Sequence, residues 1–369
     1  MADQAGPTKT ISDFEAKLTE ADKTVASFER DDRTLGHMVR GVLRNYPTII
    51  PTLILVLAIA CFGIVAHNFL KLSTLSLVLQ QVTVTGVVAI AQTIVILTAG
   101  IDLSVGAILV VSSFVMGRLA TQDNAFGETI AQAGLQVPLA IMLGIALAAF
   151  MGWINGALVT YLKLPPFIVT LGMLSNFTFF KLWYSKSESV RADVIEKKAS
   201  SLLWFGNSMS FEQASITYGG IALILLAVAV WYLLNRTAWG RHVHAMGDDP
   251  DAALLAGIRT NYTLVSVYTL AGLICGIGAW ISIGRVGSVS PIGFETVNLD
   301  SITAVVIGGT SLFGGRGSII GSVLGAMIVG VFSTGLSLAG VDSIWQYLAA
   351  GCLVIFAVAV DQWLRRASQ

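Results

Sequence analysis

Ten long apolar runs follow one another along this chain of 369 residues, and they constrain its fold more than any other feature. They lie at 48–67, 75–99, 103–121, 135–161, 166–184, 216–235, 262–285, 299–313, 317–340 and 344–363. A helix needs about 20 apolar residues to cross the ~30 Å hydrocarbon core of a bilayer. The run at 75–99 is interrupted by polar residues and 299–313 is short. The sequence therefore predicts an all-α polytopic membrane protein with about ten transmembrane helices, and eight or nine remain open.

Composition agrees with a membrane protein and excludes several other classes. Hydrophobic residues make up 55% of the chain and charged residues only 12%, whereas soluble domains carry about 25% charged residues. The 22 basic and 22 acidic residues balance, which excludes nucleic-acid binding through global positive charge. All three cysteines lie inside apolar runs, which excludes a disulfide scaffold or zinc cluster. The 37 glycines suit helices that pack closely in lipid.

The chain divides into a polar tail at 1–46 and a transmembrane domain at 47–364, which contains a polar loop at 236–261. A capping box at 12–15 opens an apolar stripe in the tail, which predicts an amphipathic helix; a loosely ordered solvated tail remains an alternative. The arginines that precede the first span place the N-terminus in the cytoplasm. With ten spans both termini and the 236–261 loop are cytoplasmic, whereas the long 185–215 loop lies outside.

Two glycine-rich segments between apolar runs resemble each other. Residues 99–106 can be laid over residues 308–315, so that Ala99 matches Gly308. Transporters are often built from parallel or inverted repeats with glycine-broken helices at matching positions. The sequence thus favours two repeated halves, with chance similarity between two membrane turns as the alternative.

The sequence contains no recognisable catalytic apparatus. It has no G-x-x-x-x-G-K-[ST] phosphate loop, no G-x-S-x-G elbow and no HExxH spacing among its four histidines. We therefore expect no enzyme activity, no metal site and no cofactor in this chain, and any energy from ATP must come from another polypeptide.

Neutral hydrogen-bonding groups occur within the apolar runs. A polar group in hydrocarbon is costly unless it finds a partner, so these groups should face other helices or an aqueous path. Interhelical hydrogen bonding is the alternative for each of them, and Asp102 is equally an N-cap candidate for the next helix. As a set they suit a polar, uncharged substrate. The pathway candidates are Gln92, Asp102, Ser104, Asn155, Thr170, Asn176, Gly308 and Gly309.

The loop at 236–261 carries signals for a short helix outside the membrane. Asp249 can cap it, Pro250 suits its first position, and Gly257 can end it. The small side chains of Ala252 and Ala253 allow close docking of a partner. A well-capped connector without a partner is the alternative to a lever pressed by a soluble protein.

Five blocks together resemble the monosaccharide type of ABC-transporter permease, whose members import ribose, xylose, galactose, arabinose and fructose. The resemblance covers roughly residues 50–363. The blocks are Leu97-Thr98-Ala99-Gly100-Ile101-Asp102-Leu103-Ser104-Val105-Gly106, Gly152-Trp153-Ile154-Asn155-Gly156, 164–172 (LPPFIVTLG), 306–318 (VIGGTSLFGGRGS) and the loop at 245–258.

The resemblance implies a permease of the bacterial inner membrane, used as a homodimer. A cytoplasmic ABC ATPase that consumes ATP and Mg would drive it, and a periplasmic sugar-binding protein would deliver a monosaccharide. It also implies that the 245–258 loop is the coupling helix that meets the ATPase. The coupling residues are Gly247, Asp248, Asp249, Pro250, Ala252, Ala253, Gly257 and Ile258.

This chain departs from the family pattern at Asp248 and Asp249, where Gly and Asn are commoner, and at Leu254, where a basic residue is common. Exchange with other ATPases of the family is therefore in doubt. An ABC permease for branched-chain amino acids and an ion-coupled secondary transporter remain alternatives, and an intramembrane enzyme is disfavoured.

Overall fold

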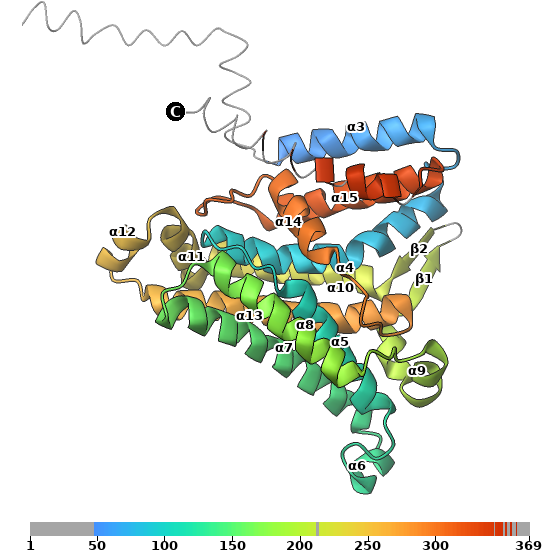
Figure 1. The fold of residues 1–369 in the computed structure, drawn as a ribbon. Coiled ribbons are helices and arrows are strands. Elements are labelled where there is room, and N and C mark those ends of the chain that lie inside the picture. The colour runs from blue at the N-terminus through green and yellow to red at the C-terminus, as the bar shows by residue number, and fades with distance from the viewer. Residues whose placement is uncertain are drawn as a thin grey trace, which may run out of the picture. The chain divides into compact units, whose positions relative to one another are not determined.

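The computed structural model describes residues 48–211, 214–342, 344–349, 351–352, 355 and 359, which form a bundle of helices with one small hairpin (Figure 1). The predicted tail helix at 1–46 lies outside the described residues, as does most of the predicted final span after Cys352. In chain order the elements are α3 (Ile49–Val65), α4 (Leu72–Leu97), α5 (Val105–Thr121), α6 (Glu128–Gln132), α7 (Gln136–Tyr161), α8 (Pro166–Ser185), α9 (Ala192–Lys198), η1 (Ser200–Gly206), β1 (Ser208–Phe211), β2 (Ala214–Thr217), α10 (Tyr218–Arg236), α11 (Ala238–Asp248), α12 (Pro250–Leu255), α13 (Thr260–Val286), α14 (Val297–Ile307) and α15 (Ile319–Leu338).

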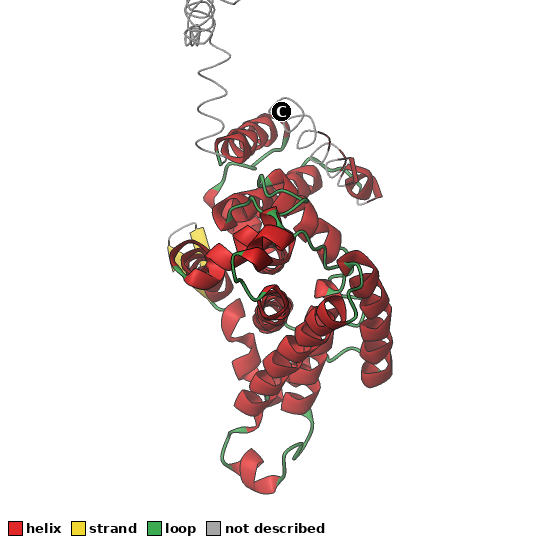
Figure 2. Ribbon diagram, turned by 90° about the vertical axis from the view of Figure 1, so that its left-hand side faces the viewer, coloured by secondary structure: helices red, strands yellow, loops and turns green. Residues whose placement is uncertain are grey.

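Five of the described helices are long and apolar enough to cross a membrane, namely α4, α7, α10, α13 and α15. Three further apolar helices, α3, α5 and α14, have 17, 17 and 11 residues. An 11-residue helix is only about 16 Å long, so α14 alone does not span the hydrocarbon. The predicted all-α membrane architecture is confirmed, while the count of ten spans stays a prediction. Figure 2 shows strands only in the hairpin β1–β2 among the described elements.

Helix α4 forms the centre of the bundle. From Val82 to Leu97 nearly every side chain is buried, because the helix is apolar around its whole circumference and can pack against neighbours on every side. It contacts α13, α14, α15 and α10. The two ends of α4 are therefore fixed relative to most of the other helices.

Helices α7 and α13 run antiparallel with their backbones in direct contact. Gly152 and Gly156 of α7 lie against α13, and Gly272 and Gly276 of α13 lie against α7. A methyl group at Gly152 would overlap the carbonyl oxygen of Tyr268, and one at Gly276 would stand 2.9 Å from the Cα of Ile145. Each helix carries a G-x-x-x-G pair, which allows such close approach between membrane helices.

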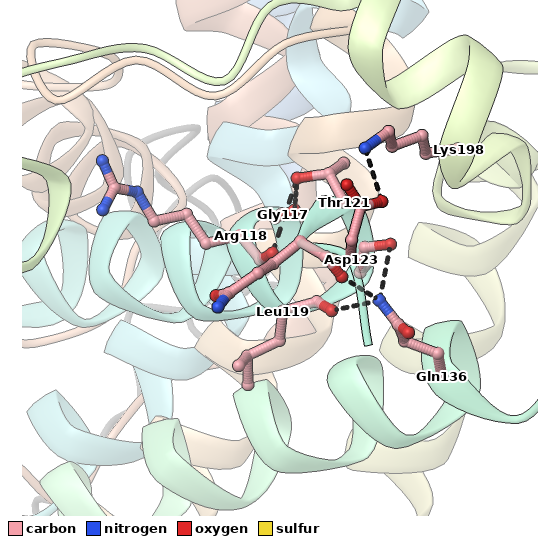
Figure 3. A network of polar contacts seen from close by, with 9 residues as sticks. Gly117, Arg118, Leu119, Thr121, Asp123, Gln136 and Lys198 are labelled. Carbon is pink, nitrogen blue, oxygen red and sulfur yellow. Dashed lines mark hydrogen bonds and ion pairs between the residues drawn. The ribbon is translucent and has the colours of Figure 1, made fainter. Parts of the chain in front are cut away.

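One end of the bundle carries a small folded cap made from the loop at 185–217. It contains α9, η1 and the antiparallel hairpin β1–β2, and Val190 pairs with Val289 in an isolated bridge. Around the end of α5, Gln136 donates to the carbonyl oxygens of Leu119 (2.9 Å) and Gln122 (2.6 Å) (Figure 3). The Lys198 ammonium lies 2.7 Å from the Asp123 carboxylate. The cap thus closes over the ends of α5 and α13.

The loops predicted on opposite sides of the membrane lie at opposite ends of the bundle. Helices α11 and α12, from the 236–261 loop, are at one end in Figure 1, and α9 and the hairpin, from the 185–215 loop, are at the other. Which end is cytoplasmic remains a prediction from the arginine bias. We call the end with α11 and α12 the inner end and the end with the hairpin the outer end.

Candidate functional site

Helix α4 ends at Leu97 and α5 begins at Val105, so residues 98–104 form a break. Two pathway candidates lie in this break, and two more contact it from other helices. The Asp102 carboxylate accepts hydrogen bonds from the Ser104 backbone N–H and from its hydroxyl, both at 2.7 Å. The Asn155 amide of α7 donates to Ser104 Oγ at 2.7 Å. Thr170 of α8 donates to the Ile101 carbonyl oxygen at 2.9 Å. The break is thereby bonded to α7 and α8.

This cluster is closed to solvent. Asp102 is 1% exposed, and Ser104, Asn155 and Thr170 are 0% exposed. In this conformation these residues therefore form hydrogen bonds between neighbouring segments, which is the alternative to a role in the pathway. Asp102 does not cap α5, although the sequence makes it an N-cap candidate. Its carboxylate bonds instead to Ser104, the residue before α5, which donates both a hydroxyl and a backbone N–H. The helix start is instead bonded through Gly106 N–H to Asn298 Oδ1 of α14, at 2.6 Å.

The second glycine-rich break, at 308–318, begins with the same backbone turn as the first. Ala99 has φ +58° and Gly309 has φ +86°. Gly100 N–H bonds to the carbonyl oxygen five residues earlier, and so does that of Thr310. This is a Schellman-type helix end, in which a left-handed residue follows the helix. In the structure Ala99 corresponds to Gly309. This differs by one residue from the alignment of the two sequences, in which Ala99 matches Gly308. Such turns end many helices, so the repeated halves stay a prediction.

The two breaks are in direct contact at the inner end of the bundle. The Gly315 backbone N–H donates to the Leu97 carbonyl oxygen at 3.0 Å. Gly247 of α11 lies against both: a methyl group there would overlap the Leu97 carbonyl oxygen and stand 2.6 Å from the Gly315 nitrogen. His244 Nδ1 lies 3.1 Å from the Gly315 carbonyl oxygen. We call the meeting point of these four residues the inner junction; they are Leu97, His244, Gly247 and Gly315.

The predicted short helix of the 236–261 loop is confirmed as α12. Asp249 Oδ1 accepts from the N–H groups of Asp251 and Ala252, both at 3.0 Å, and so caps α12. Gly257 follows the helix with φ +84°. The longer helix α11 before it was not predicted; it begins at Ala238 and carries Gly247 to the inner junction.

The coupling candidates divide into an exposed group and a buried group. Gly247 is buried and Ala253 is only 4% exposed, so both face the bundle rather than a soluble partner. Leu254 and Leu255, by contrast, are 60% and 90% exposed. The candidates Asp248, Asp249, Pro250, Ala252 and Gly257 are exposed as well, and Ile258 is half-buried. The coupling role of the candidates remains a prediction.

The remaining pathway candidates lie apart from the Asp102 cluster. Gln92 is 0% exposed, and neither amide atom has a hydrogen-bond partner among the described residues. Asn176 is exposed on α8 and bonds only to Met173 of the same helix, among those residues. Gly308 packs directly on the Gly321 backbone of α15, whereas Gly309 is exposed in the turn.

Sequence reasoning did not single out three residues of the junction and docking surface. Gly315 is only one residue of the 306–318 block, and His244 is only one of four histidines without ligand spacing. Leu255 carried no signal of its own, although two adjacent leucines in a short polar loop are a feature that could have indicated a docking surface.

Comparison with known proteins assigns the chain to a family. The profile of a family described as branched-chain amino acid transport system, permease component, matches residues 74–358. The fructose import permease protein FrcC of Rhizobium meliloti is 48% identical over 355 residues, which cover 96% of each chain. The chain belongs to this permease family. It is accordingly a multi-pass membrane protein and a transport component.

Other members of the permease family are similar over most of their length. The ribose import permease protein RbsC of Bacillus subtilis (strain 168) is 34% identical over 87% of this chain and 94% of its own. The galactose/methyl galactoside import permease protein MglC of Escherichia coli (strain K12) is 36% identical over 84% of this chain and 91% of its own. No solved structure matches this permease.

Proposed function

We propose that this chain is the membrane permease subunit of an ATP-binding-cassette importer that carries a monosaccharide across the bacterial inner membrane. Relatives named as fructose, ribose and galactose permeases support the substrate class. In this proposal two copies form the permease and both termini are cytoplasmic. A cytoplasmic ATPase that uses ATP and Mg docks at the inner end, a periplasmic binding protein delivers the sugar at the outer end, and this chain binds no cofactor.

The observation that carries the proposal is the position of α11 and α12. The α12 helix presents Leu254 and Leu255 outward, and α11, one residue before it, places Gly247 against both helix breaks. A soluble partner that moves α12 therefore acts through the α11 backbone on the ends of α4 and α14–α15. Because the Gly247 contact leaves no free space, a small displacement must be passed on rather than absorbed.

The mechanism then follows from the breaks. Residues 98–104 and 308–318 are non-helical, so the helices on either side of each break can change their relative angle without breaking an intact helix. Tight binding along the pathway would trap the sugar, so weak neutral hydrogen bonding suits conduction. ATP-driven closure of the partner would favour one conformation, and release would favour the other.

The test is reconstitution in liposomes with a cytoplasmic ABC ATPase and a periplasmic sugar-binding protein. We expect uptake of labelled fructose, ribose or galactose only with all components and ATP. Leu255→Glu should abolish both uptake and binding of the ATPase, whereas Leu255→Met, which keeps an apolar side chain at the same position, should retain both. Uptake by the chain alone would contradict the proposal.

Two other functions keep a specific observation in their favour. The description of the matching family names branched-chain amino acids, so competition of sugar uptake by leucine, isoleucine and valine should be measured; none is expected. An ion-coupled transporter would need a buried carboxylate, and Asp102 is one. Uptake that survives an uncoupler while ATP is held constant would exclude that mechanism.

A further inference from the structure

A cavity of about 380 Å³ lies between α4, α14, α15 and the residues Gln346, Tyr347, Ala349 and Gly351. None of the pathway candidates chosen from the sequence lines it. Its polar lining consists of Gln81, Thr85, Thr296, Asp300, Thr303, Ser333, Gln346 and Tyr347. Its volume falls within the range of pockets that hold small molecules, about 300–1,000 Å³.

The cavity lies closer to the outer end of the bundle than to the inner junction. Its α4 residue Gln81 accepts a hydrogen bond at 2.5 Å from Nη2 of Arg285, which lies in the last turn of α13 near the outer cap. Helix α14 contributes only its first two turns, through Leu299, Asp300 and Thr303. The short length of α14 thus brings its N-terminal turn to the cavity and its C-terminal end to the second break.

Asp300 supplies a hydrogen-bond acceptor that no described residue uses. Thr296 Oγ1 donates to Asp300 Oδ2 at 3.0 Å, which fixes the carboxylate. The other oxygen, Oδ1, accepts no hydrogen bond from the described residues, and no basic side chain among them pairs with Asp300. Across the described chain, the hydroxyls of Thr85 and Ser333 form no hydrogen bond either, although both line the cavity.

This combination suits a neutral polyhydroxyl compound. A carboxylate oxygen accepts strong hydrogen bonds from sugar hydroxyls, and threonine and serine hydroxyls can either donate or accept. Tyr347, also in the lining, offers an aromatic face for the C–H side of a sugar ring. A cation would need several oxygen ligands of high charge, and the described residues hold no group of three acidic or histidine ligands.

We propose that this cavity is a transit site for the monosaccharide, with Asp300 as the main acceptor of sugar hydroxyls and Thr85 and Ser333 as secondary partners. The inference rests on the proposed function and adds the place where the sugar binds. Because α14 is only about 16 Å long, movement of the second break at the inner junction reaches Asp300 directly. Helix α14 thus connects the sugar site to the second break.

The first test measures uptake by the complete complex in liposomes, with labelled fructose, ribose and galactose as probes. Asp300→Asn should lower uptake about tenfold at sugar concentrations below saturation, since one charge-assisted acceptor is lost. Ser333→Leu should lower it by a similar factor because the side chain fills the cavity.

Two buried threonines provide a matched pair of variants. Thr303 and Thr263 are both 3% exposed, and each donates to the carbonyl oxygen four residues earlier, at 2.7 and 3.1 Å. Only Thr303 lines the cavity. Thr303→Val should reduce uptake severalfold, whereas Thr263→Val should not; equal effects would show that the loss comes from helix packing and would overturn the proposal.

The second test reports on the cavity without transport. In a chain whose native cysteines are replaced by alanine, Ser333→Cys should react with a membrane-impermeant thiol reagent added from outside, and sugar-loaded binding protein should slow the reaction. Ser282→Cys, at a position 3% exposed in α13, should not react. A reactive position 333 without sugar protection, or normal uptake by Asp300→Asn and Ser333→Leu, would overturn the transit site.

The two proposals fail in distinguishable ways. If the wild-type complex takes up none of the three sugars, the proposed function is wrong. If the wild type transports sugar, Leu255→Glu abolishes transport and the cavity variants behave normally, the function stands and only the transit site is wrong.

Discussion

The backbone N–H of Gly315 donates to the carbonyl oxygen of Leu97 at 3.0 Å, across more than half of the chain's length. Leu97 is the last residue of α4, and its carbonyl is one of those left without a partner inside the helix. The bond therefore satisfies a helix end and joins the two breaks at once. Gly247 lies against both atoms, so the three backbones meet without side chains between them.

The first prediction concerns this contact. Gly247→Ala places a methyl group on the Leu97 carbonyl oxygen, which should separate α11 from the breaks and destabilise the fold by about 1–3 kcal/mol. Sugar uptake by the complete complex should fall strongly. Gly172→Ala is the matched control, because an added Cβ there has nothing within 4 Å; equal behaviour of the two variants would contradict the coupling role.

The second prediction concerns the packing of α7 on α13. Gly152→Ala should lower the thermal unfolding temperature of the detergent-solubilised protein, because the added methyl group overlaps the Tyr268 carbonyl oxygen. Gly278→Ala on α13 should be milder, since the added methyl group would stand 3.1 Å from a side-chain methyl group of Val87 and would overlap no backbone atom. A larger loss at Gly278 than at Gly152 would show that the backbone contact is not the decisive one.

The third prediction compares two buried serines. Ser104→Ala removes the donor to Asp102 and the acceptor for Asn155, and should cost about 1–3 kcal/mol because both groups remain buried. Ser113→Ala removes only a bond to Val110 within α5 and should cost less, about 0.5–1 kcal/mol. Unfolding in denaturant measures the difference, and equal costs would argue against the cluster as a stabilising unit.

The fourth prediction ranks the contacts at the outer end (Figure 3). Gln136→Glu keeps the shape of the side chain but removes the N–H donor to the carbonyl oxygens that end α5, so it should destabilise by about 1–2 kcal/mol. Lys198→Ala breaks an ion pair whose side chains are 45% and 84% exposed, and such pairs are worth about 0–1 kcal/mol. The reverse order in thermal unfolding would contradict this ranking.

Features encoded by neighbouring residues could be predicted from the sequence. Asp249, Pro250 and Gly257 specify the start and end of α12 locally, and the structure confirms the helix. The apolar runs likewise located the principal helices. In contrast, α11 contains Gly240, Gly247 and two histidines, which are weak helix formers; its helical structure depends on packing against α10 and α13, which a local pattern does not record.

The candidate site was predicted only in part, for the same reason. Four candidates around Asp102 do meet, because each is a polar group in an apolar run that needs a partner. Their closure, however, depends on how α7 and α8 pack. The contact between Gly247 and Leu97 joins residues far apart in the sequence, and so does the cavity around Asp300. Neither this contact nor this cavity produces a periodic pattern or a characteristic residue spacing in the sequence.

The glycine contacts between α7 and α13 have a consequence for how the molecule can change shape. If one of these helices slid past the other by a turn, about 5.4 Å, each glycine would move away from the stretch of backbone on which it packs. We therefore expect this pair to stay fixed during a transport cycle. Motion would then occur beside the breaks, and we expect the short helix α14 and its neighbour α15 to shift against the fixed pair.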